Sequence, residues 1–364
     1  MCQISHIISI PLVSMGNYRH YGSPIRETII HNKNVNMSLI DEYFSLWGSP
    51  KSIHFNDTQV HYHTPNPIDS VMNRDVNVCS NDTFLLMMFP IIRNAFALRQ
   101  IIRRAIPQGI MIQGKRINRV FVVAVSDDER EAMKTIRHEK ESYGDIVISR
   151  HYDRFALVHL STWDGYVWVR EHCRSATFTG KFDSDAIHFL GNYVSLLVQY
   201  PKRRFFGGRY SGEKTMQARN KSLPIGLYSV PYDYPLIKHF QSISGAASII
   251  SVDVIDYLMI GTMYEPYYVC AEDFMTSVIL DGMGIKPIYM GTELCPYMVF
   301  NNKWFCDGRF MNLSNVPNCL CCYHGIKNVT EYNNTIAFFG NRLYTSKLTD
   351  KVNLSKPLRW PCYL

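Results

Sequence analysis

Between residues 83 and 187, apolar runs of strand length alternate with amphipathic segments of helix length, a pattern compatible with few folds. The expected strands are TFLLMMFPII (83–92), RVFVVAVS (119–126), DIVISRHY (145–152) and ATFTGKFDSDAI (176–187). The expected helices are NAFALRQIIRRAI (94–106), DDEREAMKTIRHEKESYG (127–144) and LSTWDGYVWVREHC (160–173). Because strands that alternate with helices form βαβ units, we predict an α/β fold with a mostly parallel central sheet flanked by helices.

Two common classes of nucleotide-binding α/β protein are disfavoured. A dinucleotide-binding fold needs Gly-x-Gly-x-x-Gly after its first strand, but the segment PIIRNAFALR that follows here has no glycine. The phosphate-binding pattern GxxxxGK[ST] occurs nowhere in the chain. Rossmann oxidoreductases and P-loop NTPases are therefore poor candidates.

Two carboxylates, Asp183 and Asp185, lie at the carboxyl end of the last expected strand. An Asp-x-Asp pattern is expected by chance about once in a chain with 19 Asp among 364 residues, and most such carboxylates are simply exposed. Their position adds information, because ligands of open α/β sheets bind beyond the carboxyl ends of the strands. Paired carboxylates at such a place favour a divalent cation that faces a phosphate.

Cysteines and glycosylation motifs favour the secretory pathway. The chain has ten cysteines, six of them within its last 70 residues, which weakly indicates an oxidising compartment. Asn-x-Ser/Thr occurs eight times, against roughly three expected by chance. The matching residues are Asn36, Asn56, Asn81, Asn220, Asn312, Asn328, Asn333 and Asn353. The apolar stretch 4–15 is too short for the ~20 residues of a membrane span.

The net charge of +7 comes with basic clusters that can meet phosphates, nucleic acid or water. No helix-turn-helix, zinc-finger or RNP-type signature accompanies the charge, so we expect no nucleic-acid partner and keep a basic nucleic-acid binder only as a minor hypothesis. Changes in composition divide the chain into an irregular leader (1–82), a main α/β domain (83–295) and a Cys-rich C-terminal extension (296–364).

From about Thr83 to Pro287 the chain resembles the β-1,3-galactosyltransferase family. The resemblance lies in the order and spacing of several motifs, none of which is specific alone. They are LRQIIRRAI (98–106), Glu139, DIVISRHYD (145–153), Trp168-Val169, Cys173, Lys181, Asp183-Ser184-Asp185, YDYP (232–235), Gly245, Ser251, Asp253 and AEDFMTSVILDGMGIKP (271–287).

The resemblance implies a GT-A-type fold and an inverting hexosyltransferase. Such an enzyme moves galactose or N-acetylhexosamine from a UDP-sugar to a glycan, glycoprotein or glycolipid acceptor, most often in a β-1,3 link. It also implies Mn²⁺ or Mg²⁺ as cofactor and a place in the Golgi. A membrane anchor is usual in the family, although no span is visible in this chain.

Roles for single residues follow from the resemblance and from their chemistry. Asp185 is the expected metal ligand, with Asp183 reaching the ribose, or the metal through water. Asp273 is the expected base at the start of a helix, beside Glu272, and a helix-capping role is the alternative for that Asp. Lys181 is expected to pair with a neighbouring carboxylate.

Further residues carry open alternatives. Arg99 and Arg103, one turn apart, are expected either at the nucleotide diphosphate or on a solvated helix face. His324 completes the metal shell or joins a zinc site with Cys319, Cys321 and Cys322, although disulfides are the preferred explanation of these cysteines. Trp168 and Cys173 are expected to be packing residues.

Several positions depart from the family pattern, and they motivate a second hypothesis. Ala105, Ile106 and Pro107 stand for Thr-Trp-Gly, Leu157 and Ser161 for an Asn and a Lys, and Phe189 for an Asn, while Ala247 and Ser248 alter a Gly-x-Gly-Tyr segment. The alternative to an active enzyme is therefore a catalytically weak relative that binds nucleotide-sugar or glycan.

Overall fold

The central sheet is mixed. The computed structural model describes residues 51–55, 58–62, 73–153, 158–214, 217–218, 229–230, 240–264, 272–290, 298–300, 303–306, 309–312, 321–324 and 328–346. Seven strands of the main sheet follow one another in the order β13 (Ile288–Tyr289), β9 (Phe206–Lys214), β12 (Phe240–Ser251), β7 (Phe178–Phe182), β3 (Thr83–Pro90), β5 (Lys115–Ala124) and β4 (Ile110–Ile112). The eighth strand, β6 (Ile146–Ser149), also pairs with β5.

The main sheet contains both parallel and antiparallel pairs of strands. β3 is parallel to β5 and β7, and β6 is parallel to β5, as the alternation of strands and helices predicts. β12, however, runs antiparallel to both β7 and β9. β4 forms an antiparallel hairpin with β5 through Gln113 and Gly114, whose φ values of 50° and 73° suit a tight hairpin turn. The prediction of a mostly parallel sheet is thus corrected, because it rested on residues before 187.

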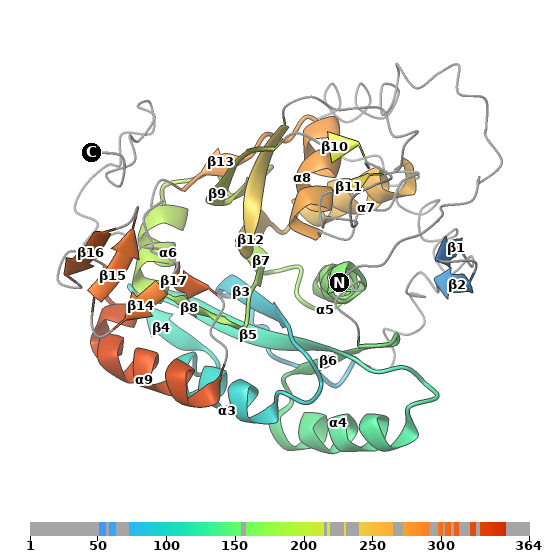
Figure 1. Cartoon of the computed structure of the whole chain (residues 1–364), viewed down its shortest axis with the longest axis horizontal. Coiled ribbons are helices and arrows are strands. Elements are labelled where there is room, and N and C mark those ends of the chain that lie inside the picture. Colours follow the sequence, from blue (N-terminus) through green and yellow to red (C-terminus); the bar gives the residue numbers. More distant parts are fainter. Residues whose placement is uncertain are drawn as a thin grey trace.

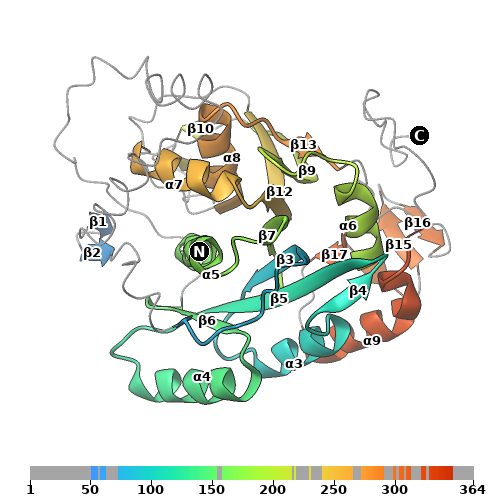
Figure 2. The same ribbon diagram turned by 180° about the vertical axis from the view of Figure 1, so that it is seen from behind.

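Helices cover both faces of the sheet (Figures 1 and 2). On one face lie α3 (Phe96–Ala105), α4 (Arg130–Tyr143), α6 (Leu190–Leu197) and α9 (Val329–Phe339), and on the other α5 (Val158–His172), α7 (Val254–Tyr264) and α8 (Glu272–Gly282). Strand side chains alternate between two hydrophobic cores: Met88 belongs to the core that includes α5, α7 and α8, whereas Met87 belongs to the core that includes α3, α4, α6 and α9. Both cores contain strand residues with no exposed surface, as expected for a sheet covered on both faces.

The boundaries of the expected elements agree well with the structure. α3 ends at Ala105, two residues before Pro107, and α4 is followed by Gly144 with φ 63°. The expected last strand splits into β7 and the short β8 (Ala186–His188), with Asp183–Asp185 between them. Asp183, Ser184 and Asp185, called the acidic triplet below, therefore form the short connection between two strands.

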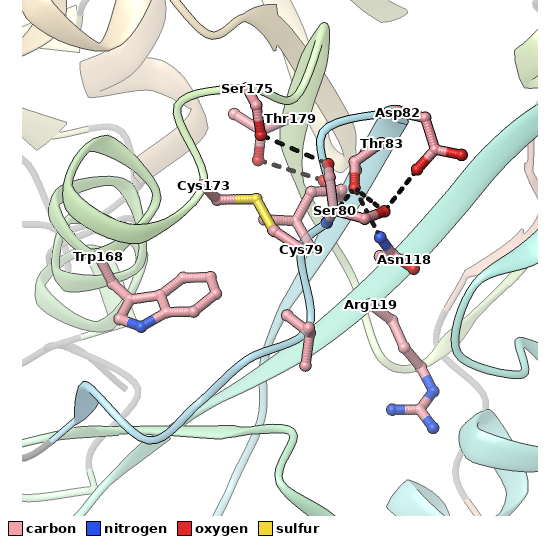
Figure 3. The surroundings of a disulfide bond; sticks show 12 residues. Cys79, Ser80, Asp82, Thr83, Asn118, Arg119, Trp168, Cys173, Ser175 and Thr179 are labelled. Carbon is pink, nitrogen blue, oxygen red and sulfur yellow. Dashed lines mark hydrogen bonds between the residues drawn. A yellow bond between two sulfur atoms is a disulfide. The ribbon is translucent and has the colours of Figure 1, made fainter.

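Residues 73–82, which the sequence assigns to the leader, pack on the domain. Val76 and Val78 are buried in the core shared with α5, and the Asn73 amide bonds to Ile148 of β6 in both directions. A disulfide joins Cys79 to Cys173 at the end of α5, with a Cα–Cα distance of 5.6 Å (Figure 3). Cys173 is buried, as expected of a packing residue, but its bond to Cys79 was not predicted.

Removal of this disulfide should cost stability. The two cysteines are 94 residues apart, and opening a loop of that size raises the entropy of the unfolded chain, so we expect Cys79→Ser/Cys173→Ser to lose about 2–5 kcal/mol of unfolding free energy. Urea unfolding of the double variant and of the wild-type chain, each with and without reductant, measures the effect. Reductant should destabilise the wild-type chain more than the double variant, because only the wild-type chain has the Cys79–Cys173 bond. Equal stability of both under oxidising conditions would contradict the prediction.

Segments after residue 300 pack against the region of Asp183. β17 (Cys321–His324) pairs antiparallel with β8, and the Tyr332 hydroxyl of α9 donates to the Ala186 carbonyl at 3.0 Å. The Tyr344 hydroxyl donates to the Ala105 carbonyl at 2.8 Å. The described parts of the predicted C-terminal extension thus belong to the same packed unit as the sheet.

The remaining elements are small. β1 (Lys51–Phe55) pairs with β2 (Thr58–Tyr62), and β10 (Gln217–Ala218) with β11 (Ser229–Val230). A three-stranded sheet contains β14 (Met298–Phe300), β15 (Lys303–Cys306) and β16 (Arg309–Asn312), and α9 leads into the 3₁₀ helix η5 (Gly340–Leu343). Within the ranges that the structure describes, none of the helices has the length and apolarity needed to cross a membrane.

Candidate active site at the carboxyl end of β7

The acidic triplet forms a turn directly after β7. The Ala186 amide donates to the Asp183 carbonyl at 3.3 Å, which closes the turn, and the Asp183 amide donates to the Ala246 carbonyl of β12 at 3.2 Å. Asp183, Ser184 and Asp185 are each half-buried, whereas Phe182 and Ala186 on either side are fully buried. The two carboxylates are thus carried by a short, well-anchored backbone segment at the rim of the core.

Lys181 links this turn to α8. Its ammonium group forms an ion pair with Asp183, lies 2.8 Å from Glu272 Oε1, and donates to the Gly245 carbonyl at 3.0 Å. The Lys181 side chain is only 7% exposed, so these contacts occur away from bulk water. Asp183, Gly245 and Glu272, which are distant in sequence, therefore all contact the buried Lys181 ammonium group. Lys181 was expected to pair with one carboxylate, and it pairs with two.

Asp273 joins the same group through the backbone of β12. Its Oδ2 accepts a hydrogen bond from the Gly245 amide at 3.1 Å. A Cβ at position 245 would lie 2.9 Å from Lys181 Nζ and 3.2 Å from Glu272 Oε1, so a larger residue there would displace the ends of these two side chains. Gly245 therefore leaves room for Lys181 of β7 and Glu272 of α8 to contact each other.

Burial and charge shift the pKa values of this group. Burial would lower the pKa of Lys181, but the nearby carboxylates of Asp183 and Glu272 raise it well above its ordinary value. Burial raises the pKa of Glu272, with Lys181 opposing and Asp273 and Asp183 adding to the rise. Burial likewise raises the pKa of Tyr166 on α5, whose hydroxyl bonds to the backbone of Lys181. The lysine stays charged, and Glu272 holds a proton more readily than an exposed glutamate does.

Arg99 and Arg103 have other partners. Arg99 is fully buried and makes two hydrogen bonds to Glu139 of α4, at 2.9 and 2.6 Å. Arg103 is buried and makes two to Asp145, at 2.9 and 2.7 Å. Asp145 also pairs with Arg119 of β5. Burial excludes the solvated helix face, and the bidentate pairs assign both arginines to the packing of α3 rather than to a nucleotide, which corrects their expected role.

The described residues supply only part of a metal shell. Among the residues of known placement, no three His, Cys, Asp or Glu side chains gather closely enough to hold a metal ion. Asp183 and Asp185 provide two hard oxygen donors, as Mn²⁺ or Mg²⁺ prefers. The backbone of His324 pairs with Ala186, next to Asp185, but the side chains of His324, Cys319, Cys321 and Cys322 lie outside the described part.

The departures from the family pattern have local explanations where the structure describes them. Phe189 is buried, and its ring lies edge-on to Phe339 of α9 with centroids 5.1 Å apart. Ala247 and Ser248 pair in register with Phe182 and Lys181. Ser161 Oγ is 3.1 Å from His151 Nε2.

The other departures lie on α3 and before α5. Ala105 and Ile106 are buried at the end of α3, and the Ile106 carbonyl accepts from Arg119 Nε at 2.7 Å. Pro107 is exposed just beyond that helix. Leu157 lies outside the described residues.

Sequence reasoning missed two residues beside the acidic turn. Tyr166 contacts the backbone of Lys181, and His188 contacts the backbone of Asp183. A buried tyrosine within a helix and a histidine within a three-residue strand carry no local signal of function. Only the packing of α5 and β8 against the end of β7 identifies them.

Comparisons with known proteins agree on one family. The galactosyltransferase family model matches residues 97–291. Beta-1,3-galactosyltransferase 1 of Mus musculus is 24% identical over 260 residues, which cover 68% of this chain and 77% of that protein. Beta-1,3-galactosyltransferase 5 is 24% identical in Mus musculus, covering 60% of this chain and 70% of that one, and 23% identical in Homo sapiens, covering 58% and 67%.

Among solved structures, a 4-diphosphocytidyl-2C-methyl-D-erythritol synthase from Anaerococcus prevotii is 11% identical and covers 57% of this chain and 88% of its own. Its TM-score of 0.28 is too low to bear on the fold. The family model, in contrast, covers more than half of the chain and includes Lys181, the acidic turn and the Glu272–Asp273 pair. The chain belongs to the galactosyltransferase family.

Proposed function

We propose that the chain transfers a hexose, galactose or N-acetylhexosamine, from a UDP-sugar to a hydroxyl of a glycan acceptor with inversion, in a β-1,3 link. One observation carries the proposal: the buried Lys181 ammonium contacts both Asp183 of the acidic turn and Glu272 of α8. If Asp183 marks the site of the leaving diphosphate and α8 carries the base, this contact supports a close arrangement of the two. Inverting transfer needs both, because the acceptor loses its proton as the diphosphate departs.

Each residue then has a chemical task. Asp185 and Asp183 would hold Mn²⁺ or Mg²⁺, with His324 as a further candidate ligand, and the bound cation supplies charge neutralisation of the departing diphosphate. Lys181 forms an ion pair with Asp183 and fixes the direction of its carboxylate. Asp273, held at Oδ2 by the Gly245 amide, accepts the acceptor proton, while Glu272 sets the position of Lys181.

The proposed place of action is the secretory pathway, in the Golgi. The Cys79–Cys173 disulfide supports an oxidising compartment. Three sequon asparagines have side chains that the structure describes, Asn81, Asn328 and Asn333, and all three are exposed, as glycosylation requires. The acceptor is proposed to be a glycoprotein or glycolipid glycan that matures in the same compartment.

The proposal is tested by UDP release from UDP-galactose and UDP-N-acetylhexosamines, with and without Mn²⁺ and across a panel of acceptor glycans. We expect Mn²⁺-dependent transfer that falls about 10²- to 10³-fold in Asp185→Asn, because one charged contact to the cation is lost. Asp82→Asn is the control, since Asp82 is exposed at the amino end of β3. Transfer that survives Asp185→Asn unchanged would refute the metal assignment.

A weakly active relative that binds nucleotide-sugar or glycan is the second candidate function. The burial of Phe189 against Phe339 supports it, because a packed ring stands where the family pattern has an amide. This candidate predicts Mn²⁺-dependent UDP binding without transfer to any acceptor in the panel. Robust transfer would exclude it.

A further inference from the structure

His188 lies beneath the acidic turn in an aromatic cage. It is the last residue of β8 and is 5% exposed. Its ring centroid lies 5.3 Å from that of Phe182, 5.7 Å from Phe89 and 6.0 Å from Tyr193. Its Nε2 is 3.0 Å from the Asp183 carbonyl oxygen, and its Nδ1 is 3.0 Å from the Tyr193 hydroxyl. Both ring nitrogens therefore have a polar neighbour although the site is apolar.

These partners determine where the ring proton resides. A carbonyl oxygen only accepts hydrogen bonds, so Nε2 must carry the hydrogen that bonds to Asp183. In the neutral ring Nδ1 then has a lone pair, which accepts from the Tyr193 hydroxyl. Tyr193 is fully buried on α6, so its hydroxyl is held in place by packing. The tyrosine thereby fixes the tautomer that His188 needs to hold the turn.

The carbonyl that His188 binds is the one that closes the acidic turn. Asp183 O also accepts from the Ala186 amide at 3.3 Å, and the Asp183 amide is held by the Ala246 carbonyl. The peptide groups on both sides of Asp183 are thus fixed, one by β12 and one by His188. We propose that His188 is a positioning residue that keeps the Asp183–Asp185 turn in the conformation that presents both carboxylates to a cation and diphosphate. This inference rests on the proposed function.

Three variants separate positioning from simple packing. His188→Gln keeps an Nε donor at a similar reach, His188→Leu fills the cage without one, and Tyr193→Phe removes only the hydroxyl that orients the ring. Partners that orient metal ligands typically contribute 10- to 100-fold in affinity, so we expect His188→Leu to weaken Mn²⁺-dependent UDP binding by about 10- to 100-fold. His188→Gln should stay within about threefold of wild type, and Tyr193→Phe should fall between them. Isothermal titration calorimetry with UDP and Mn²⁺ measures binding, and thermal unfolding is recorded for each variant.

Measurements without any ligand test the positioning itself. The ¹⁵N spectrum of the wild-type chain should show a His188 ring protonated at Nε2, and exchange of the Ala186 amide should be faster in His188→Leu than in His188→Gln. An Nδ1-protonated ring, wild-type binding by His188→Leu, or equal losses of binding and unfolding temperature in the Leu and Gln variants would overturn the inference. If the wild-type chain binds no UDP with Mn²⁺, the proposed function fails, and the exchange measurement still decides whether His188 holds the turn.

Discussion

Asp273→Asn should lower kcat for sugar transfer by about 10²- to 10⁴-fold, because an amide cannot accept the proton that the acceptor hydroxyl loses. The asparagine carbonyl can still accept the hydrogen bond from the Gly245 amide, which is 3.1 Å from Asp273 Oδ2 in the wild-type structure. The fold around β12 and the binding of UDP with Mn²⁺ should therefore be retained. Steady-state UDP release and calorimetric UDP binding, measured on the same preparation, separate the two effects.

Asp281→Asn is the matched control for that experiment. Asp281 belongs to the same helix, α8, but its carboxylate pairs with Lys286 at the far end, where Lys286 is 63% exposed. The same change of charge there should leave kcat unaltered. If Asp273→Asn transfers sugar at the wild-type rate, the base lies elsewhere, and Glu272→Gln becomes the variant to examine.

Arg99→Met should destabilise the protein by about 3–5 kcal/mol without direct contact with the acidic turn. The substitution keeps an unbranched side chain but leaves Glu139, which is itself buried, without its bidentate partner on α3. The cost arises because the buried Glu139 carboxylate then keeps only its ion pair with Arg103, at 2.9 Å, and loses the bidentate partner that compensates most of its charge. Chemical denaturation monitored by far-UV circular dichroism gives the unfolding free energy.

Arg104→Met provides the comparison, since Arg104 is on the same helix but exposed, and we expect a change within about 0.5 kcal/mol. Adding Glu139→Leu to Arg99→Met should recover part of the lost stability, because the buried charge is then removed. Equal effects of the Arg99 and Arg104 variants would show that the ion pair with Glu139 contributes little. A fall in UDP binding at unchanged stability would instead restore a nucleotide-binding role for Arg99.

Local patterns in the sequence predicted the elements of the first half of the domain well. β3, β6 and the second half of β5 (120–124) are apolar runs, and α3 is followed by a proline and α4 by a glycine, so each carries its signal within a few residues. The pairing of β12 with β7 has no such signal. Strand direction there depends on contacts between residues more than 60 positions apart, and the mixed sheet was therefore not foreseen.

The sequence pointed to the acidic residues of the candidate site but not to the contacts that bring them together. Asp183 was identified because it follows a strand, and Asp273 because it opens a helix and resembles a family motif. That Lys181 would contact both motifs required the sheet to be formed first. The arginines of α3 were misassigned because the sequence of a basic helix does not show whether its arginines bind phosphates or buried carboxylates such as Glu139.

The contacts that β8 makes with β17 and α9 have an evolutionary consequence. Tyr332 and the strand 321–324 lie beyond residue 291, where the match to the family ends, yet they bind the backbone directly after Asp185. Relatives with the same acidic triplet can therefore diverge in how firmly it is held, through substitutions in a segment that need not retain any catalytic group. In this chain Phe339 of α9 packs against Phe189, so the same C-terminal segment also contacts the residue that follows β8.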